Sequence, residues 1–197
     1  VDDCNVLGKF LFEDYFTVDG KCYAVSETAG YRNFMYNKTL WAQAGITDVP
    51  TTWAELEADL ALLSQIDGII PFTTQYTTTW CQRSWIDHFA MSVNGADWKN
   101  GWVDTDTPFS NEAMITILNG YKNIIDMGYC DPDLTSSEWD LQSADFAAGT
   151  IATYLCGNYA YATMTALGMD GSEIGFFAMP DSELTSDGNC TLFAMPD

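Results

Sequence analysis

The start of one helix in this sequence is defined by side-chain chemistry. Thr52 and Glu55 have the spacing of a capping box, in which each side chain accepts a hydrogen bond from the other residue's backbone amide. Leucines then recur with helical period, at Leu56, Leu60 and Leu63. The helix is predicted to end near Asp67 and Gly68. Because its apolar face has to be buried, it must pack against a second layer of structure.

Strand and helix patterns alternate along the rest of the chain. Aromatic and β-favouring residues bounded by turn residues predict strands at 21–25, 33–36, 151–155 and 174–179. Glycines at suitable positions end two short helices, predicted at 38–44 and 143–148. A longer helix is predicted from the N-cap Ser110 to residues 127–128, with the apolar stripe Met114, Ile117, Leu118, Tyr121, Ile124 and Ile125. This alternation predicts an α/β domain, in which the stretch 73–108 is mostly helix and loop.

Composition and charge narrow the class of protein. Hydrophobic residues make up 47% of the chain and charged residues 18%, and no apolar run is long enough to span a bilayer. A core of this size needs no cofactor or metal ion to hold it together. The formal net charge of −21 would repel nucleic-acid phosphates and anionic lipids alike. Nucleic acid is therefore not expected as a partner, and the scattered carboxylates are predicted to form a solvated surface.

The motifs of common catalytic and metal sites are missing from the sequence. The six cysteines form no CxxC pair, so disulfides and buried thiols both stay open. The single histidine, His88, lies in an Asp-His-Phe-Ala setting and is predicted to be structural. The sequence has no P-loop, GxGxxG or EF-hand pattern. A glycosidase carboxylate pair cannot be identified by spacing, because the separation that matters is spatial.

Aromatic residues suggest the class of ligand. Phe, Trp and Tyr make up 14% of the chain, and several of the seven tryptophans stand beside small polar residues. A pyranose stacks its C–H face on an aromatic ring while its hydroxyl groups need donors and acceptors at the rim. Trp53, Trp41 and Phe34 are predicted to be core residues. Trp80, Tyr159 and Tyr161 are the better candidates for a binding cleft.

Four segments in a fixed order resemble one known family. They are Asp19-Gly20-Lys21-Cys22-Tyr23, Phe34-Met35-Tyr36-Asn37-Lys38, Ala44-Gly45-Ile46 and Pro50-Thr51-Thr52-Trp53-Ala54-Glu55-Leu56. Further matches follow at residues 68–72, 146–150, 157–159 and 174–180. Together they resemble the extracellular solute-binding proteins that serve carbohydrate ABC importers. This sequence departs from the family pattern in having Tyr159 where tryptophan is usual, and in its six cysteines.

The resemblance implies an architecture. The expected fold is a periplasmic-binding-protein-like lobe of type II, helix-rich, with a mixed sheet flanked by helices. Residues 1–197 are expected to form a single domain that corresponds to most of one lobe, with the other lobe missing from this chain. Members of the family close two lobes over the ligand and then dock on a membrane permease.

The resemblance also implies site residues. Tyr159 matches the aromatic residue of the family's GSW-like motif and is expected to be a stacking platform, with Asn158 beside it as a hydrogen-bonding group. Tyr31 and Arg32 lie in a region that often faces the cleft, and Trp80 resembles another frequent cleft position. Tyr161 completes the set of expected ligand-binding residues, and no catalytic or metal-binding residue is expected.

The implied function is capture of a carbohydrate, in particular an oligosaccharide, without chemistry on it. The expected partners are the sugar and the permease of an ABC importer, and the protein is expected to be an extracellular or periplasmic monomer, lipid-anchored at the cell surface in full length. No cofactor is expected. Two alternatives stay open: a glycoside-processing enzyme with a carboxylate pair, and a binding protein for peptides or cationic amines, which the negative charge would attract.

Overall fold

A computed structural model describes residues 17–24, 32–81, 112–178 and 180. The chain divides into two compact units, Val1–Tyr31 and Arg32–Asp197. In the first unit, β1 (Thr17–Val18) and β2 (Lys21–Cys22) form an antiparallel hairpin. Asp19 and Gly20 both have positive φ, 51° and 73°, as a tight two-residue hairpin turn requires. The predicted strand at 21–25 is confirmed only for residues 21–22, since Tyr23 and Ala24 lie outside β2 and Val25 lies outside the described residues.

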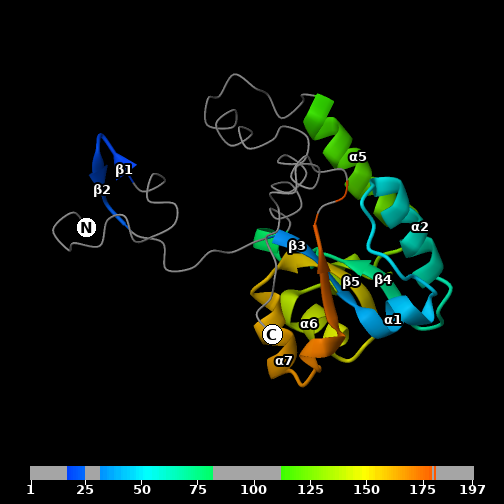
Figure 1. Cartoon of the computed structure of the whole chain (residues 1–197). Helices are drawn as coiled ribbons and strands as arrows, with labels where there is room; N and C mark the ends of the chain where they lie inside the picture. The colour runs from blue at the N-terminus through cyan, green and yellow to red at the C-terminus, as the bar shows by residue number, and fades with distance from the viewer. Residues whose placement is uncertain (1–16, 25–31, 82–111, 179, 181–197) are drawn as a thin grey trace. The chain divides into compact units, whose positions relative to one another are not determined.

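The second unit is built on a mixed sheet of four strands (Figure 1). The spatial order is β4 (Ile70–Thr73), β5 (Ile151–Gly157), β3 (Arg32–Asn37) and β6 (Ile174–Phe177). β4 pairs with β5 in parallel, whereas β3 is antiparallel to both β5 and β6. The predicted strands at 33–36, 151–155 and 174–179 are confirmed in place, although β6 ends at Phe177.

Helices cover both faces of this sheet (Figure 1). One face packs on α1 (Lys38–Gln43), α2 (Trp53–Leu63) and α5 (Glu112–Asp126). The other face packs on α6 (Trp139–Ala147) and α7 (Ala160–Ala166). Two 3-10 helices, Leu134–Ser136 and Gly171–Glu173, precede α6 and β6. No helix within the described residues combines the length and the apolar character needed to cross a bilayer.

The first core lies between the sheet and α1, α2 and α5. Phe34 from β3 stacks on Phe177 from β6 with ring centroids 4.8 Å apart. Trp41 is buried there and donates a hydrogen bond from Nε1 to Thr153 Oγ1 on β5 at 3.2 Å. Trp53 is partly buried against the same cluster. The prediction that Phe34, Trp41 and Trp53 are core residues is confirmed.

Helix α2 begins as predicted but ends earlier. Thr52 Oγ1 accepts from the Glu55 amide at 3.2 Å, and Glu55 Oε2 accepts from the Thr52 amide at 3.0 Å. The three predicted leucines are fully buried. The helix ends at Leu63, because the amides of Gln65 and Ile66 bond three residues back and tighten the chain into turns. The predicted end near residues 67–68 is therefore wrong, although Gly68 ends the turn with φ 78°.

Helices α5 and α6 correct the sequence predictions in detail. On α5, Ile124 is buried and Tyr121 and Ile125 pack beside it, but Leu118 is 46% exposed. Six residues correspond to about 240° of helical rotation, so Leu118 lies off the face that Ile124 buries. Helix α6 begins at Trp139 and not at Ser143, because the Gln142 amide already donates to the Glu138 carbonyl. Ser110, His88 and the predicted stretch beyond residue 81 lie outside the described residues.

Candidate functional site

Three strands of the sheet end at one edge. β4 is parallel to β5, and β6 is parallel to β5 as well, since both are antiparallel to β3. β3 therefore begins where the other three strands end. In open α/β sheets, ligands bind in the crevice outside the carboxyl ends of the strands. This carboxyl edge is the candidate site, and residues 74–81 after β4 and 158–159 after β5 leave the sheet there.

Three aromatic side chains gather at this edge, and we call Trp80, Trp139 and Tyr159 the aromatic cluster. The ring of Trp139 lies 5.2 Å from that of Trp80 and 5.8 Å from that of Tyr159, between centroids. Trp80 and Tyr159 are 6.0 Å apart. Trp80 is 45% exposed and Tyr159 40% exposed, so both rings present large apolar area to solvent. Exposed aromatic surface of this kind is typical of a binding site.

Hydrogen bonds tie together the two chain segments that carry the tryptophans. The Trp139 amide donates to Thr78 Oγ1 at 3.0 Å. The Tyr76 amide donates to Ser137 Oγ, and the Thr77 amide to the Ser137 carbonyl, both at 3.2 Å. Ser137 is itself buried. These bonds hold the loop after β4 against the start of α6, and so set the positions of Trp80 and Trp139 relative to each other.

Buried polar groups lie beneath the cluster. The Tyr154 ring is 6.1 Å from that of Trp139, and its hydroxyl group lies 3.2 Å from Ser143 Oγ. Burial raises the pKa of Tyr154, so the phenol stays protonated and keeps its donor. Gln75, just after β4, is fully buried with φ 51°, a left-handed conformation that is unfavourable for a residue with a side chain. Backbone strain of this kind clusters at functional sites.

The structure places the sequence-predicted site residues at different positions. Trp80 and Tyr159 come together in the aromatic cluster, and Asn158 is the half-buried residue just before Tyr159. Tyr161 packs on Phe176, with ring centroids 6.4 Å apart. Arg32 opens β3 opposite Gly157. Tyr31 lies outside the described residues.

Sequence reasoning missed Trp139. Its chain neighbours are the carboxylates Glu138 and Asp140, and not the small polar residues that singled out Trp80. Sequence reasoning also passed over Asn33. The sequence feature that could have drawn attention to Asn33 is its carboxamide, which directly precedes the aromatic strand segment Phe34-Met35-Tyr36.

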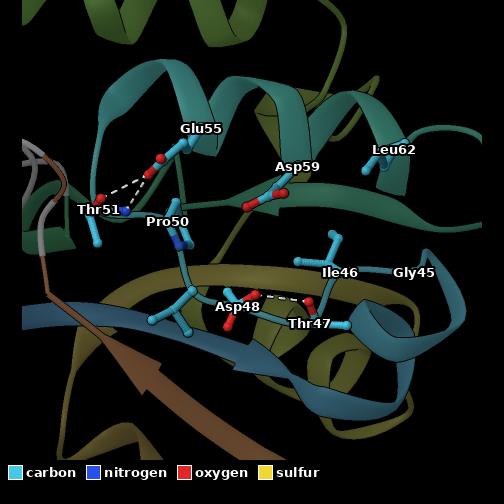
Figure 2. A pocket seen from close by; sticks show the side chains of 10 residues that line it. Gly45, Ile46, Thr47, Asp48, Pro50, Thr51, Glu55, Asp59 and Leu62 are labelled. Atoms are coloured by element: carbon cyan, nitrogen blue, oxygen red, sulfur yellow. Dashed lines mark hydrogen bonds between the residues drawn. The ribbon is translucent and has the colours of Figure 1, made fainter.

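A hollow of about 460 Å³ lies beside the loop from α1 to α2 (Figure 2). Residues 45–51 form one wall, and Glu55, Asp59 and Leu62 of α2 form the other. Desolvation, together with the nearby Glu55 carboxylate, raises the pKa of Asp59 to about 6. Backbone amides of Thr51 and Thr52 bond Glu55 and lower its pKa. The hollow shares no residue with the aromatic cluster.

Metal ligation finds no support in the part of the chain that the structure describes. No group of three His, Cys, Asp or Glu side chains within it is arranged to hold a metal ion. The thiol of Cys130 instead lies 2.6 Å from the Tyr76 hydroxyl, and burial raises the pKa of Cys130 to about 11. This thiol is therefore protonated at neutral pH.

The chain resembles known binding proteins throughout most of its length. The family model described as bacterial extracellular solute-binding protein matches residues 9–197. A binding protein of Brucella abortus, strain 2308, is 32% identical over 134 residues, which cover 66% of this chain and 31% of the relative.

Solved structures show the same fold. A chitin oligosaccharide binding protein superposes with a TM-score of 0.79 at 25% identity, over 91% of this chain and 45% of that protein. A binding protein of an ABC transporter from Bifidobacterium animalis subsp. lactis, in complex with mannobiose, gives 0.76 at 24% identity, over 87% and 42%. The chain thus spans less than half the length of these proteins. The expected periplasmic-binding-protein-like fold, a mixed sheet with flanking helices, is confirmed.

Proposed function

The chain belongs to the family of bacterial extracellular solute-binding proteins, and from this premise we propose that it captures a carbohydrate, in particular an oligosaccharide, for an ABC importer. The matched relatives are binding proteins and not enzymes. Two of the similar structures are named for oligosaccharide ligands, a chitin oligosaccharide and mannobiose. The resemblance of the sequence to carbohydrate importers agrees with these names.

The observation that carries this proposal is the aromatic cluster at the carboxyl edge of the sheet. Trp80 and Tyr159 expose their rings there, and Trp139 lies between 5 and 6 Å from both. A sugar ring offers an apolar C–H face that stacks on such a surface, and its hydroxyl groups need polar partners around it. Asn158, next to Tyr159, is a suitable group at the rim.

The remaining parts of the proposal concern the whole protein. We infer that residues 1–197 correspond to most of one lobe, and that a second lobe closes over the bound sugar. The closed form would then dock on the permease as a monomer, outside the cytoplasm and held at the cell surface by a lipid anchor. The ligand would leave unchanged, since capture and release need no chemistry. Tyr31, Arg32 and Tyr161 remain proposed ligand contacts on the strength of the sequence resemblance.

The test is a titration of intrinsic tryptophan fluorescence with galactose, mannobiose, mannotriose, chitotriose and acarbose. We expect a saturable change with at least one oligosaccharide, which the Tyr159→Ala variant loses. Leu167→Ala, which removes an exposed apolar side chain at the C-terminal end of α7, is the matched control and should bind like the unmodified chain. A response to none of the sugars, or hydrolysis of aryl glycosides, would contradict the proposal.

The effect of salt separates a neutral sugar from a cationic ligand. Stacking and hydrogen bonding to a neutral sugar should change little between low and high ionic strength. A peptide or amine attracted by the charge of −21 would instead bind far more weakly as salt is added.

A further inference from the structure

The carboxamide of Asn33 is buried at the edge that carries the candidate site. Asn33 is 2% exposed. Among the described residues, neither its Oδ1 nor its Nδ2 has a hydrogen-bond partner. Buried polar groups in folded proteins are nearly always hydrogen-bonded, because an unpaired one has lost its water without gaining a partner. An amide with both ends unpaired therefore needs a specific explanation.

The register of the sheet places Asn33 on the same face as the aromatic cluster. Asn33 is paired with Cys156 on β5, and Met35 is paired with Tyr154. Cross-strand partners share one face of a sheet, and so do residues two apart on a strand. Asn33 and Tyr154 are therefore on one face, and Trp139 packs on Tyr154 there. The Asn33–Cys156 pair lies two residue pairs closer than Met35–Tyr154 to the carboxyl edge, where β5 leads to Tyr159.

The chemistry of the side chain indicates what it can bind. A carboxamide offers an acceptor oxygen and a donor NH₂ group side by side. Two neighbouring hydroxyl groups of a pyranose offer the complementary pair, since each hydroxyl can donate or accept. A carboxylate would accept only, and an ammonium group would donate only. Asparagine therefore suits a neutral diol better than it suits an ionic ligand.

We infer that Asn33 determines sugar specificity by hydrogen-bonding, through its carboxamide, two adjacent hydroxyl groups of the carbohydrate that stacks on the aromatic cluster. This inference rests on the proposed function, because it presumes a sugar at the carboxyl edge. Since Asn33 is almost inaccessible, the packing around it has to open as the sugar binds. Its role is to discriminate between sugars by their hydroxyl groups, whereas the rings of the cluster accept any pyranose with an exposed C–H face.

The test compares three variants by titration with mannotriose and chitotriose and by thermal unfolding. Asn33→Leu keeps the size of the side chain but removes both polar ends, and should weaken binding of the tighter sugar at least tenfold. It should leave the unfolding midpoint unchanged or higher, because the unpaired amide is gone. Asn33→Ser puts a single hydroxyl group in place of the carboxamide and should give a smaller loss. Thr73→Val is the control. It also removes a fully buried hydroxyl group that has no partner among the described residues, but Thr73 lies on β4, where it is paired with Tyr154 of β5.

Sugars that lack one hydroxyl group each supply the second readout. Removing either hydroxyl that Asn33 binds should weaken binding to the unmodified chain and to Thr73→Val, yet make little further difference to Asn33→Leu. Unchanged affinity of Asn33→Leu would overturn the inference and leave sugar capture standing. Equal sensitivity of Asn33→Leu and the unmodified chain to every missing hydroxyl would overturn it too. If the unmodified chain binds none of the five sugars of the fluorescence titration, the inference falls together with the proposed function.

Discussion

The rings of Trp139 and Tyr159 lie 5.8 Å apart with their planes tilted by 43°. Trp139 begins α6 and Tyr159 follows β5, so the contact joins two elements at the carboxyl edge of the sheet. Trp139 contacts both other rings of the cluster, and the hydrogen bond from its amide to Thr78 anchors it. Because Trp80 and Tyr159 also contact each other, at 6.0 Å, the three rings form one continuous proposed sugar platform.

Replacing Trp139 should weaken sugar binding. We expect Trp139→Ala to lower affinity about tenfold or more, roughly 1.4 kcal/mol, because it removes one ring and the support of two others. Calorimetric titration of Trp139→Ala, Tyr159→Ala and the double variant measures the coupling. The losses of binding free energy in the two single variants should sum to more than the loss measured in the double variant. Full additivity would mean that the two rings act independently.

The hydrogen bond between Trp41 and Thr153 should contribute to stability. Thr153→Val keeps the shape of the side chain but leaves the buried indole N–H unpaired, which should cost about 1–3 kcal/mol in urea unfolding. Trp41→Phe leaves the threonine hydroxyl unpaired in the same way. The double variant Trp41→Phe/Thr153→Val should lose less than the sum of the two single variants, since it leaves no orphaned group from this pair. Strict additivity would refute the role of the bond.

The capping box should stabilise α2. Thr52→Ala removes the acceptor for the Glu55 amide and should lower the free energy of unfolding by about 1 kcal/mol. Thr52→Asn should retain most of the stability, because asparagine is an equally good N-cap. Urea unfolding monitored by circular dichroism gives both values. Thr47→Ala, an exposed change in the preceding loop, is the control, and a loss as large as that of Thr52→Ala would argue against a specific effect of the cap.

The raised pKa of Asp59 should make stability depend on pH. Its pKa of about 6 in the folded protein exceeds the ordinary value of 3.8, so the folded state holds the proton more tightly than the unfolded state. The ionised Asp59 side chain therefore lowers the free energy of unfolding most above pH 6. This destabilisation disappears as the pH falls below 4. Asp59→Asn should gain about 1 kcal/mol at pH 7.5, after allowance for solvent screening, and nothing at pH 4.

Unfolding midpoints measured from pH 4 to pH 8 test this expectation. Glu57→Gln controls for the loss of one negative charge from the same helix. A gain by Asp59→Asn that is the same at both ends of the range would show that the effect does not come from this carboxyl group.

Local interactions made several elements predictable from sequence. The capping box, the glycine stop after α1 and the pattern of β3 depend on residues close together in the chain, and the structure has them where they were predicted. The end of α2 was misplaced because turn hydrogen bonds decide it, and the start of α6 was misplaced because its N-cap, Glu138, makes no side-chain capping bond. The resemblance to a known family supplied what local patterns cannot, namely the mixed sheet and the hypothesis that Trp80 and Tyr159 belong to a binding site.

By itself, then, the amino-acid sequence determined the capped helices, the strands, the strong negative charge and the family. Only the tertiary structure decided that Trp139 contacts both Trp80 and Tyr159, and that Asn33 faces the same side of the sheet as Tyr154. These residues are far apart in the chain. They meet because three strands end at one edge and because the register of β3 against β5 assigns each side chain to a face, and strand pairing of this kind is set by contacts distant in sequence.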